Sequence, residues 1–440
     1  MSSEPDTAAP GASRGSGRRR RIGAFILDTR PLKVVPFRRL WVSTAVTAIG
    51  SQLTAVAVPK QVFDITNSSG YVGLAGAVAL VPLLVFGLWG GAIADTVDRR
   101  KLLLASNTGI ALTSLLLWVQ ALVRLDSVAV VLVLLAVQQG LFAINQPTRS
   151  ASVARLVPPE LLPAANAVYS TVFNFGAVLG PLLAGAFIPV LGLPTLYLID
   201  ALGLCLTMWA VWRLPPLPPL AGPIRRAGLR DVLDGFRYLS VRPVLLASFL
   251  LDIIAMVAGM PRALFPEMAE RTFGDPPGGG VALGWLFAAI PVGAVVCGLV
   301  SGWLSRISRH GVAVVVAVCG WGVAVAAFGV THSLWLAALF LGLAGAADMV
   351  SMVFRNSILQ TAATDEMRGR MQGVFTVVVT GGPRIADTVH GVAGAAVGTT
   401  ATVAGGGLLV VVLALVAAAL LPAFRRYRAP RAGETVPAAG

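Results

Sequence analysis

The chain of 440 residues is 56% hydrophobic and only 12% charged, with a mean hydropathy of +0.80, whereas an average soluble domain is about 45–50% apolar and 25% charged. These values exclude a soluble globular protein. The formal net charge is +14. Because the basic residues lie between the apolar runs, we interpret this excess as a determinant of membrane topology and not as a nucleic-acid surface.

Twelve stretches are long and apolar enough to cross a membrane. A transmembrane helix needs about 20 residues, at a rise of 1.5 Å per residue, to cross about 30 Å of hydrocarbon. The sequence therefore predicts an all-α polytopic membrane protein with twelve transmembrane helices, at 37–63, 71–94, 101–123, 127–150, 164–189, 194–213, 243–265, 281–304, 312–330, 334–357, 370–396 and 400–423.

The distribution of Lys and Arg predicts the orientation of these spans. With a cytoplasmic N-terminus, 29 of the 34 basic residues lie on cytoplasmic segments or at span ends. Positive residues favour the cytoplasmic side, so we expect both termini there and the chain in the inner membrane. The basic run 18–21 either binds anionic lipid or acts only as a topological signal. The five exceptions are Lys60, Arg124, Arg262, Arg271 and Arg384.

A hydrophilic, proline-rich stretch divides the spans six and six. We expect a cytoplasmic arm (1–36), a six-helix half (37–213), a linker (214–242), a second six-helix half (243–423) and a cytoplasmic tail (424–440). Weak internal repeats support the division, since several residue pairs recur at an offset of 206. They are Arg149 and Arg355, Glu160 and Glu366, Gly176 and Gly382, and Gly185 and Gly391.

The segment at the end of the second span carries Gly91, Asp95 and Arg99 at four-residue spacing, and Arg100 follows Arg99 directly. Here the chain resembles the major facilitator superfamily of secondary transporters, although Thr96 and Asp98 depart from its usual loop. The resemblance implies a conformational latch on the cytoplasmic face. The alternative is a turn that serves topology alone.

The fifth span combines small residues four apart with a proline, at Gly176, Gly180, Pro181 and Gly185. Such a pattern predicts a bent helix with a close helix–helix seam. It is similar to the motif of the superfamily's exporters, with Ala184 in place of a glycine, although packing alone also explains it. The arginine that many proton antiporters of the superfamily carry in helix 4 is replaced by Ala136.

Further motifs in both halves resemble the enterobactin-exporter-like branch, which also contains macrolide and multidrug efflux pumps. The resemblance covers about residues 35–425. The motifs are Pro147-x-Arg149, Ala165-Asn166, Ile199-Asp200-Ala201, Pro261 to Pro266, Gly345 to Asp348, Arg355, Gln360, Arg368-Gly369-Arg370, Gly381 to Arg384, and Asp387.

Ionisable residues inside spans are costly and therefore candidates for proton coupling. They are Asp252, Asp348, Arg384, Asp387 and His390. Asp252 has no basic residue within four positions on its helix, so we expect it to carry the proton. Asp348 and Arg384 have similar depths and are expected either to pair or to contact substrate. Asp200 is expected to cap or pack at the outer end of the sixth span, and Lys60 to reach the membrane surface.

The sequence lacks a GxxxxGK[ST] phosphate loop, an HExxH motif and a CxxC pair. We expect no enzymatic activity, no metal or cofactor and no ATP hydrolysis, so an ion gradient or the substrate's own gradient drives transport. The expected function is proton-coupled export of an amphipathic drug, macrolide or siderophore by a monomer. The alternatives are a lysophospholipid flippase and a non-transporting receptor or scaffold. Aromatic cavity candidates are Trp89, Phe142, Tyr169, Phe173, Trp285, Phe354 and Phe375.

Overall fold

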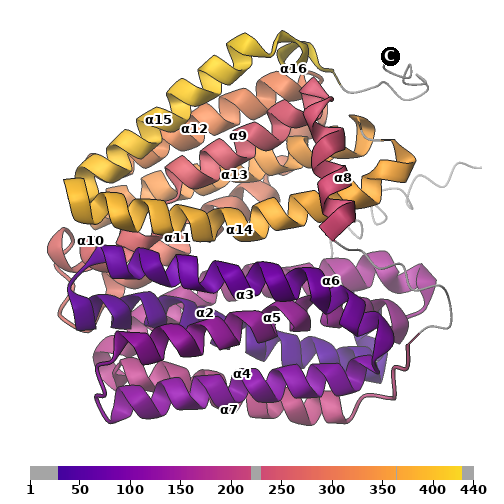
Figure 1. The fold of residues 1–440 in the computed structure, drawn as a ribbon, viewed down its shortest axis with the longest axis vertical. Helices are drawn as coiled ribbons and strands as arrows, with labels where there is room; N and C mark the ends of the chain where they lie inside the picture. The colour runs from indigo at the N-terminus through magenta and orange to yellow at the C-terminus, as the bar shows by residue number, and fades with distance from the viewer. Residues whose placement is uncertain (1–27, 220–228, 363, 429–440) are drawn as a thin grey trace, which may run out of the picture.

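A computed structural model describes residues 28–219, 229–362 and 364–428. Over these ranges the chain consists of helices joined by short connections, and no strand occurs among them. The predicted all-α class is confirmed. Figure 1 shows two stacked bundles of long helices, the N-terminal half in indigo and magenta below the C-terminal half in pink, orange and yellow.

The N-terminal half contains six long helices. α2 packs against α6 and α7, α5 packs against α3 and α4, and α4 also contacts α7. Serine and aspartate residues begin two of these helices by accepting backbone N–H groups, at Ser68 and Asp98. The elements are η1 (Arg30–Lys33), α2 (Val35–Thr66), α3 (Ser69–Thr96), α4 (Arg99–Leu122), α5 (Val128–Leu156), η2 (Pro159–Leu161), α6 (Leu162–Leu191) and α7 (Leu193–Trp212).

The C-terminal half also contains six long helices among its described residues. α12 contacts α9, α13 and α15, while α11 packs against α13. The elements are α8 (Leu229–Ser240), α9 (Pro243–Gly259), η3 (Arg262–Leu264), α10 (Phe265–Arg271), α11 (Val281–Leu299), η4 (Ser301–Arg306), α12 (His310–Val330), α13 (Leu334–Ala362), α14 (Asp365–Val397), α15 (Thr399–Leu420) and α16 (Pro422–Arg426).

Eleven helical segments of the described chain are long and apolar enough to cross a membrane. α14 occupies the predicted span 370–396 and is a twelfth long helix, of 33 residues, that is not among the eleven. It is the span that carries Arg384 and Asp387. The observed helices therefore follow the predicted spans closely, and the twelfth differs from the others in its polarity.

The seventh predicted span, 243–265, is not one continuous helix. α9 ends at Gly259, and Met260 has the non-helical dihedrals φ −118° and ψ 86°. Proline disfavours the helical conformation of the residue before it, so Pro261 explains the break. The chain then continues through η3 into α10, which contacts α2 and α11. The eighth span is also shorter than predicted, because α11 ends at Leu299 and η4 follows.

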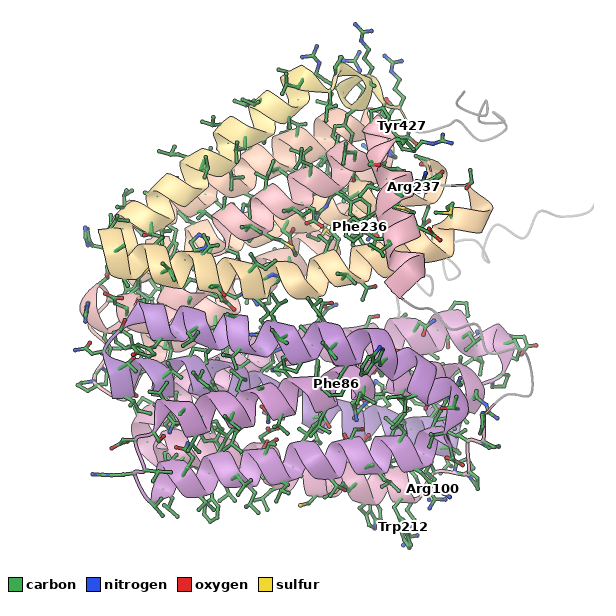
Figure 2. All side chains as sticks on the ribbon, viewed as in Figure 1. Phe86, Arg100, Trp212, Phe236, Arg237 and Tyr427 are labelled. Atoms are coloured by element: carbon green, nitrogen blue, oxygen red, sulfur yellow. The ribbon has the colours of Figure 1, made fainter. Side chains whose placement is uncertain are left out.

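The two ends of the molecule differ. η1, α8 and α16 lie at one end, which we call the terminal end, and α10 lies at the opposite end, which we call the α10 end (Figure 1). α8 crosses the terminal end of the C-terminal half and packs on α9 and α14. Its labelled residues Phe236 and Arg237 lie near Tyr427 at this end (Figure 2).

Candidate functional site

The two halves meet along two helix pairs, α3 with α14 and α6 with α11. Both seams use glycine. A Cβ added to Gly73 would lie 2.8 Å from the carbonyl oxygen of Asp387, and one added to Gly185 would lie 2.7 Å from the Cα of Gly284. Only glycine permits backbones to approach this closely. In the predicted repeat the second and fifth spans correspond to the eighth and eleventh, so the two seams are equivalent.

The seam between α3 and α14 is tight at the α10 end and loose at the terminal end. Gly391 lies against the backbone of Gly73, whereas a Cβ on Gly87 or Gly373 would meet no atom within 4 Å. Figure 1 shows the same two helices side by side at the left and diverging to the right. The contact between the halves is therefore concentrated at the α10 end.

A buried lysine joins the halves at the α10 end. The Lys60 side chain is completely buried, and its Nζ pairs with Asp64 on α2 and with Glu270 on α10. The expectation that Lys60 reaches the membrane surface is wrong, because two carboxylates satisfy its charge inside the protein. Lys60 thus connects α2 of one half to α10 of the other.

Two further polar contacts support the same junction. Arg271 of α10 donates to Oδ1 of Asn67 at 2.7 Å and to Glu267 on its own helix at 2.5 Å. The Ser69 hydroxyl, at the start of α3, donates to Glu267. The α10 end is therefore closed by a network of charged and polar side chains from both halves.

Arg355 on α13 lies between two carboxylates. Its Nη1 pairs with Oδ1 of Asp252 on α9, and its Nη2 lies 3.5 Å from Oδ1 of Asp348. The side chains of Arg355 and Asp252 are 5% and 2% exposed, whereas that of Asp348 is 39% exposed. The expectation that Asp252 lacks a cationic partner is wrong, because the partner comes from a different helix.

Arg384 and Asp387 on α14 form a second charged pair, with 3.8 Å between Nη1 and Oδ2. Nη2 of Arg384 also donates to Oε1 of Gln139 on α5 at 3.4 Å, across the junction of the halves. The expected pair of Asp348 with Arg384 is not formed, because Asp348 lies beside Arg355 instead. Asp348 and Arg384 therefore each have a different partner from the one that the sequence predicted.

Two more ionisable residues lie close to this cluster. Arg262 is in η3, which packs on α14, the helix that carries Asp387. His390 is 2% exposed, with Nδ1 3.0 Å from the carbonyl oxygen of Ala386 and Nε2 3.2 Å from that of Ala258. A neutral imidazole donates through one nitrogen only, so a neutral His390 leaves one of these carbonyls without its donor.

A small hollow opens beside the Asp252–Arg355 pair. Phe249 and Phe375 form one wall, with their rings edge to face at a centroid distance of 6.3 Å. The hollow therefore brings aromatic surface next to a buried ion pair. The lining residues are Ser248, Phe249, Asp252, Arg355, Leu359 and Phe375.

The other six aromatic candidates do not line this cavity. Trp285 and Phe354 pack against Trp335 and His310 within the C-terminal half, Tyr169 and Phe173 pack on each other at 5.2 Å, Phe142 is half-buried on α5, and Trp89 is 62% exposed.

The expected latch lies at the terminal end of the N-terminal half. Gly91 and Asp95 are on α3, and their side-chain positions lie outside the described residues. Arg99 donates from Nη1 to a backbone carbonyl of α5 at 3.2 Å. Nη2 of Arg100 donates to the carbonyl oxygen of Trp212 at 2.5 Å, and Figure 2 shows these two residues together. Both arginines thus hold α4 against neighbouring segments.

The small-residue motif of α6 faces two different helices. Cβ atoms added at Gly176 and Gly180 would lie 2.9 and 2.3 Å from atoms of α2, whereas Gly185 lies against α11 of the other half. Pro181 is inside the helix and is buried. The motif therefore joins packing within the N-terminal half to the seam between the halves.

Sequence reasoning did not assign a role to Arg355, Gln139 or Arg262. A signal for Arg355 was present, because it is one of the residues that recur at the repeat offset. Arg262 stood out only as a basic residue inside a predicted span, and Gln139 gave no signal, since the neighbours of both come from tertiary packing.

Comparisons with known proteins agree with this architecture. The family described as "Transmembrane secretion effector" matches residues 28–434. The enterobactin exporter EntS of Citrobacter koseri is 29% identical over 413 residues, which are 92% of this chain and 97% of that one. EntS of Escherichia coli O1:K1 is 28% identical over 378 residues, 84% of this chain and 88% of that one.

Solved transporter structures have a similar fold. A bacterial homologue of the human lysosomal transporter Spinster, in an inward-facing and unoccupied conformation, has a TM-score of 0.65 at 15% identity and covers 90% of this chain and 97% of its own. The nucleoside transporter NupG has a TM-score of 0.69 at 11% identity, with coverages of 88% and 98%. At these identities the likeness concerns the fold alone.

Proposed function

Because this chain belongs to the transmembrane secretion effector family of the major facilitator superfamily, we propose that it exports an amphipathic small molecule in exchange for protons. The observation that carries the proposal is the group formed by Asp252, Arg355 and Asp348 beside a partly aromatic cavity. Membership of the family makes the chain a multi-pass membrane transporter and not an enzyme. The coupling ion and the direction of transport are the proposed parts.

The charge balance of this group favours proton binding. Asp252 and Asp348 share one guanidinium at ion-pair distance, so only one of them has a full ion-pair partner there, and an ionised carboxylate without one is costly in a low-dielectric interior. One proton on the second carboxylate removes that cost. Asp348 is the more exposed carboxylate, at 39% against 2% for Asp252, so less of its surface is covered by the protein. We assign the exchangeable proton to Asp348 and the permanent ion pair to Asp252 and Arg355.

Under this assignment Asp252 does not carry the exchangeable proton, which differs from the sequence-based expectation. The other candidates keep their proposed role in proton coupling. Arg384, Asp387 and His390 lie on α14, which forms one of the two seams. Movement of α14 between conformations changes the surroundings of all three. We therefore propose that these three residues change the electrostatic potential near the cavity as the halves rearrange.

Loose packing at the terminal end suits an exporter that is loading substrate. With the predicted cytoplasmic termini, the closed α10 end faces outward and the terminal end faces the cytoplasm. In alternating access one side is closed while the other is accessible. The latch residues Gly91, Asp95, Arg99 and Arg100 are proposed to stabilise the alternative closure at the terminal end.

The test is transport by the full chain in proteoliposomes under an imposed pH gradient. The names of the relatives make enterobactin the first probe, and ethidium is the second. We expect uphill movement of at least one probe. Asp348→Asn is expected to lose uphill movement and keep downhill exchange, whereas the exposed control Asp126→Asn keeps both.

Other outcomes identify the alternative functions. Movement of labelled lysophospholipid, without either soluble probe, would show a flippase. Absence of all movement by correctly folded protein would show a receptor or scaffold. Transport of a soluble probe that ignores the pH gradient would contradict proton coupling while leaving export intact.

A further inference from the structure

Asp200 on α7 has a carboxyl group that is 2% exposed inside the N-terminal half. Its Oδ2 accepts hydrogen bonds from the Thr54 hydroxyl of α2 at 2.9 Å and from the Ser114 hydroxyl of α4 at 2.8 Å. Gly50 makes room for it, because a Cβ there would lie 2.3 Å from Oδ1. Asp200 therefore joins three helices and does not cap the end of its own.

No basic side chain lies within ion-pair distance of Asp200 in the part of the chain that the structure describes. α7 packs against α2, α4 and α6, and Asp200 is the only charged residue of α7. On α2, Lys60 is occupied by Asp64 and Glu270. The other basic residues of α2 and α4, Arg38, Arg39, Arg99, Arg100 and Lys101, lie in the first turns of these helices at the terminal end, and α6 has none.

Other titratable groups near the network also have their own partners. The Tyr197 hydroxyl donates to Gln61 at 2.9 Å. Arg149 of α5 donates to Asn145, Thr44 and Asn107, not to Asp200. The two hydroxyl groups therefore solvate one oxygen of Asp200 without supplying positive charge.

A carboxyl group in these surroundings is more stable neutral than ionised. Burial of an isolated carboxylate without a counter-ion is costly enough that the group takes up a proton instead. A protonated Asp200 still accepts both hydroxyl hydrogen bonds and gains an O–H donor. The pattern of contacts thus fits a carboxylic acid.

Hydrogen bonds lead from Asp200 to α5, and the next residue of α5 contacts the other half. Ser114 Oγ accepts from Nε2 of Gln138 at 2.9 Å. The next residue, Gln139, accepts from Arg384 across the junction at 3.4 Å. Consecutive residues on a helix point about 100° apart, so α5 presents one glutamine to each half. Movement of α14 that breaks the contact between Gln139 and Arg384 therefore reaches the Asp200 network through a shift of α5 itself and not through a continuous line of hydrogen bonds.

We propose that Asp200 is a proton-binding site of the N-terminal half, loaded in the conformation of this structure and emptied when the halves rearrange. The inference deepens the proposed proton antiport and rests on it for the transport step. In each cycle the Asp200 O–H bond breaks and the proton passes to water on one side. The carboxylate left behind then takes a proton from water on the other side.

Infrared spectroscopy of the purified full chain tests proton binding without any transport. Asp200→Asn has the shape of the neutral acid, so we expect it to fold and to lose one protonated-carboxyl band in the difference spectrum against the parent. The exposed control Asp126→Asn is expected to keep every such band. If Asp200→Asn keeps every protonated-carboxyl band of the parent, the inference is overturned. So does unfolding of Asp200→Asn while Ser114→Ala remains folded, because it shows that the charge is needed.

Transport and sodium measurements separate the remaining outcomes. Asp200→Asn is expected to reduce uphill efflux at least tenfold while substrate binding remains. Unchanged uphill efflux overturns the role in the cycle even if the band is lost. If sodium chloride removes the parent's band and choline chloride does not, the site binds a sodium ion, and the inference of a proton-binding site is overturned. If the parent itself shows no pH-driven transport, the proposed function fails, and the infrared result still decides proton binding.

Discussion

Replacement of Arg355 by methionine tests the central ion pair most directly. Methionine keeps much of the side-chain volume and removes the only cation that the structure places between Asp252 and Asp348. Breaking a buried pair by removing one partner costs about 3–5 kcal/mol. For a chain of 150–250 residues, about 1 kcal/mol corresponds to 2–4 °C in Tm. We therefore expect the unfolding transition of the C-terminal half to fall by about 10 °C.

Removal of the other partner is expected to cost less. In Asp252→Asn the guanidinium keeps Asp348 as a partner at 3.5 Å, so the expected loss is about 1–3 kcal/mol, the range for hydrogen bonds to charged groups. In the double variant, Asp252→Asn with Arg355→Met, only Asp348 is left as a charge without its partner, and the Asp348 side chain is 39% exposed. The double variant's loss of stability is therefore expected to be smaller than the sum of the two single losses.

The assay is thermal unfolding in detergent, followed by tryptophan fluorescence. The matched control is Arg149→Met, since Arg149 is the repeat equivalent of Arg355 and is bonded only to neutral groups, at 2.9–3.4 Å. Its loss leaves no buried charge unpaired, so we expect about 1–3 kcal/mol. Strict additivity in the Asp252 and Arg355 double variant would refute the reasoning, as would equal losses for Arg149→Met and Arg355→Met.

The remaining predictions concern orientation and conformational change. In a cysteine-free background, Asp126→Cys is expected to react with an impermeant thiol reagent outside intact cells and Ser305→Cys is not; the reverse pattern would invert the topology. Ser69→Cys is expected to react slowly because Ser69 is 1% exposed, and Lys60→Met is expected to accelerate the reaction by opening the α10 end. An unchanged rate would show that Lys60 does not hold that end closed. Asp95→Asn is expected to slow transport more than binding, and transport equal to the parent at equal expression would remove the latch role.

Hydropathy was sufficient to place the helices, because a membrane span must be long, apolar and helical to satisfy its backbone groups. It failed where a local rule interrupted the helix, as at Met260 before Pro261. Asp98 shows a further limit. It departs from the usual loop of the superfamily, yet it accepts from the backbone N–H groups of Arg100 and Lys101 and so begins α4.

The partners of the ionisable residues were not predictable in the same way. Spacing on one helix identified Asp252, Asp348 and Arg384 as costly residues, but the contacts of each depend on which helices pack together. Arg355 reaches Asp252 because α13 contacts α9. Lys60 is buried because α10 brings Glu270 to it. Single-sequence patterns describe the faces of a helix and not its neighbours, so composition could name candidate residues but could not predict how they pair.

The repeat also shows how the halves have come to differ. In each half an arginine of the fourth long helix reaches the first, Arg149 to Thr44 on α2 and Arg355 to Asp252 on α9. The same geometry thus holds a neutral hydroxyl in one half and a carboxylate in the other. In the described structure two carboxylates share Arg355, whereas the side chains that bond Arg149 are neutral, so the proton exchange proposed at Asp348 has no equivalent beside Arg149. The N-terminal half has its buried carboxyl elsewhere, at Asp200, and we expect coupling between the two proposed sites to involve the seams and the contact of Gln139 with Arg384.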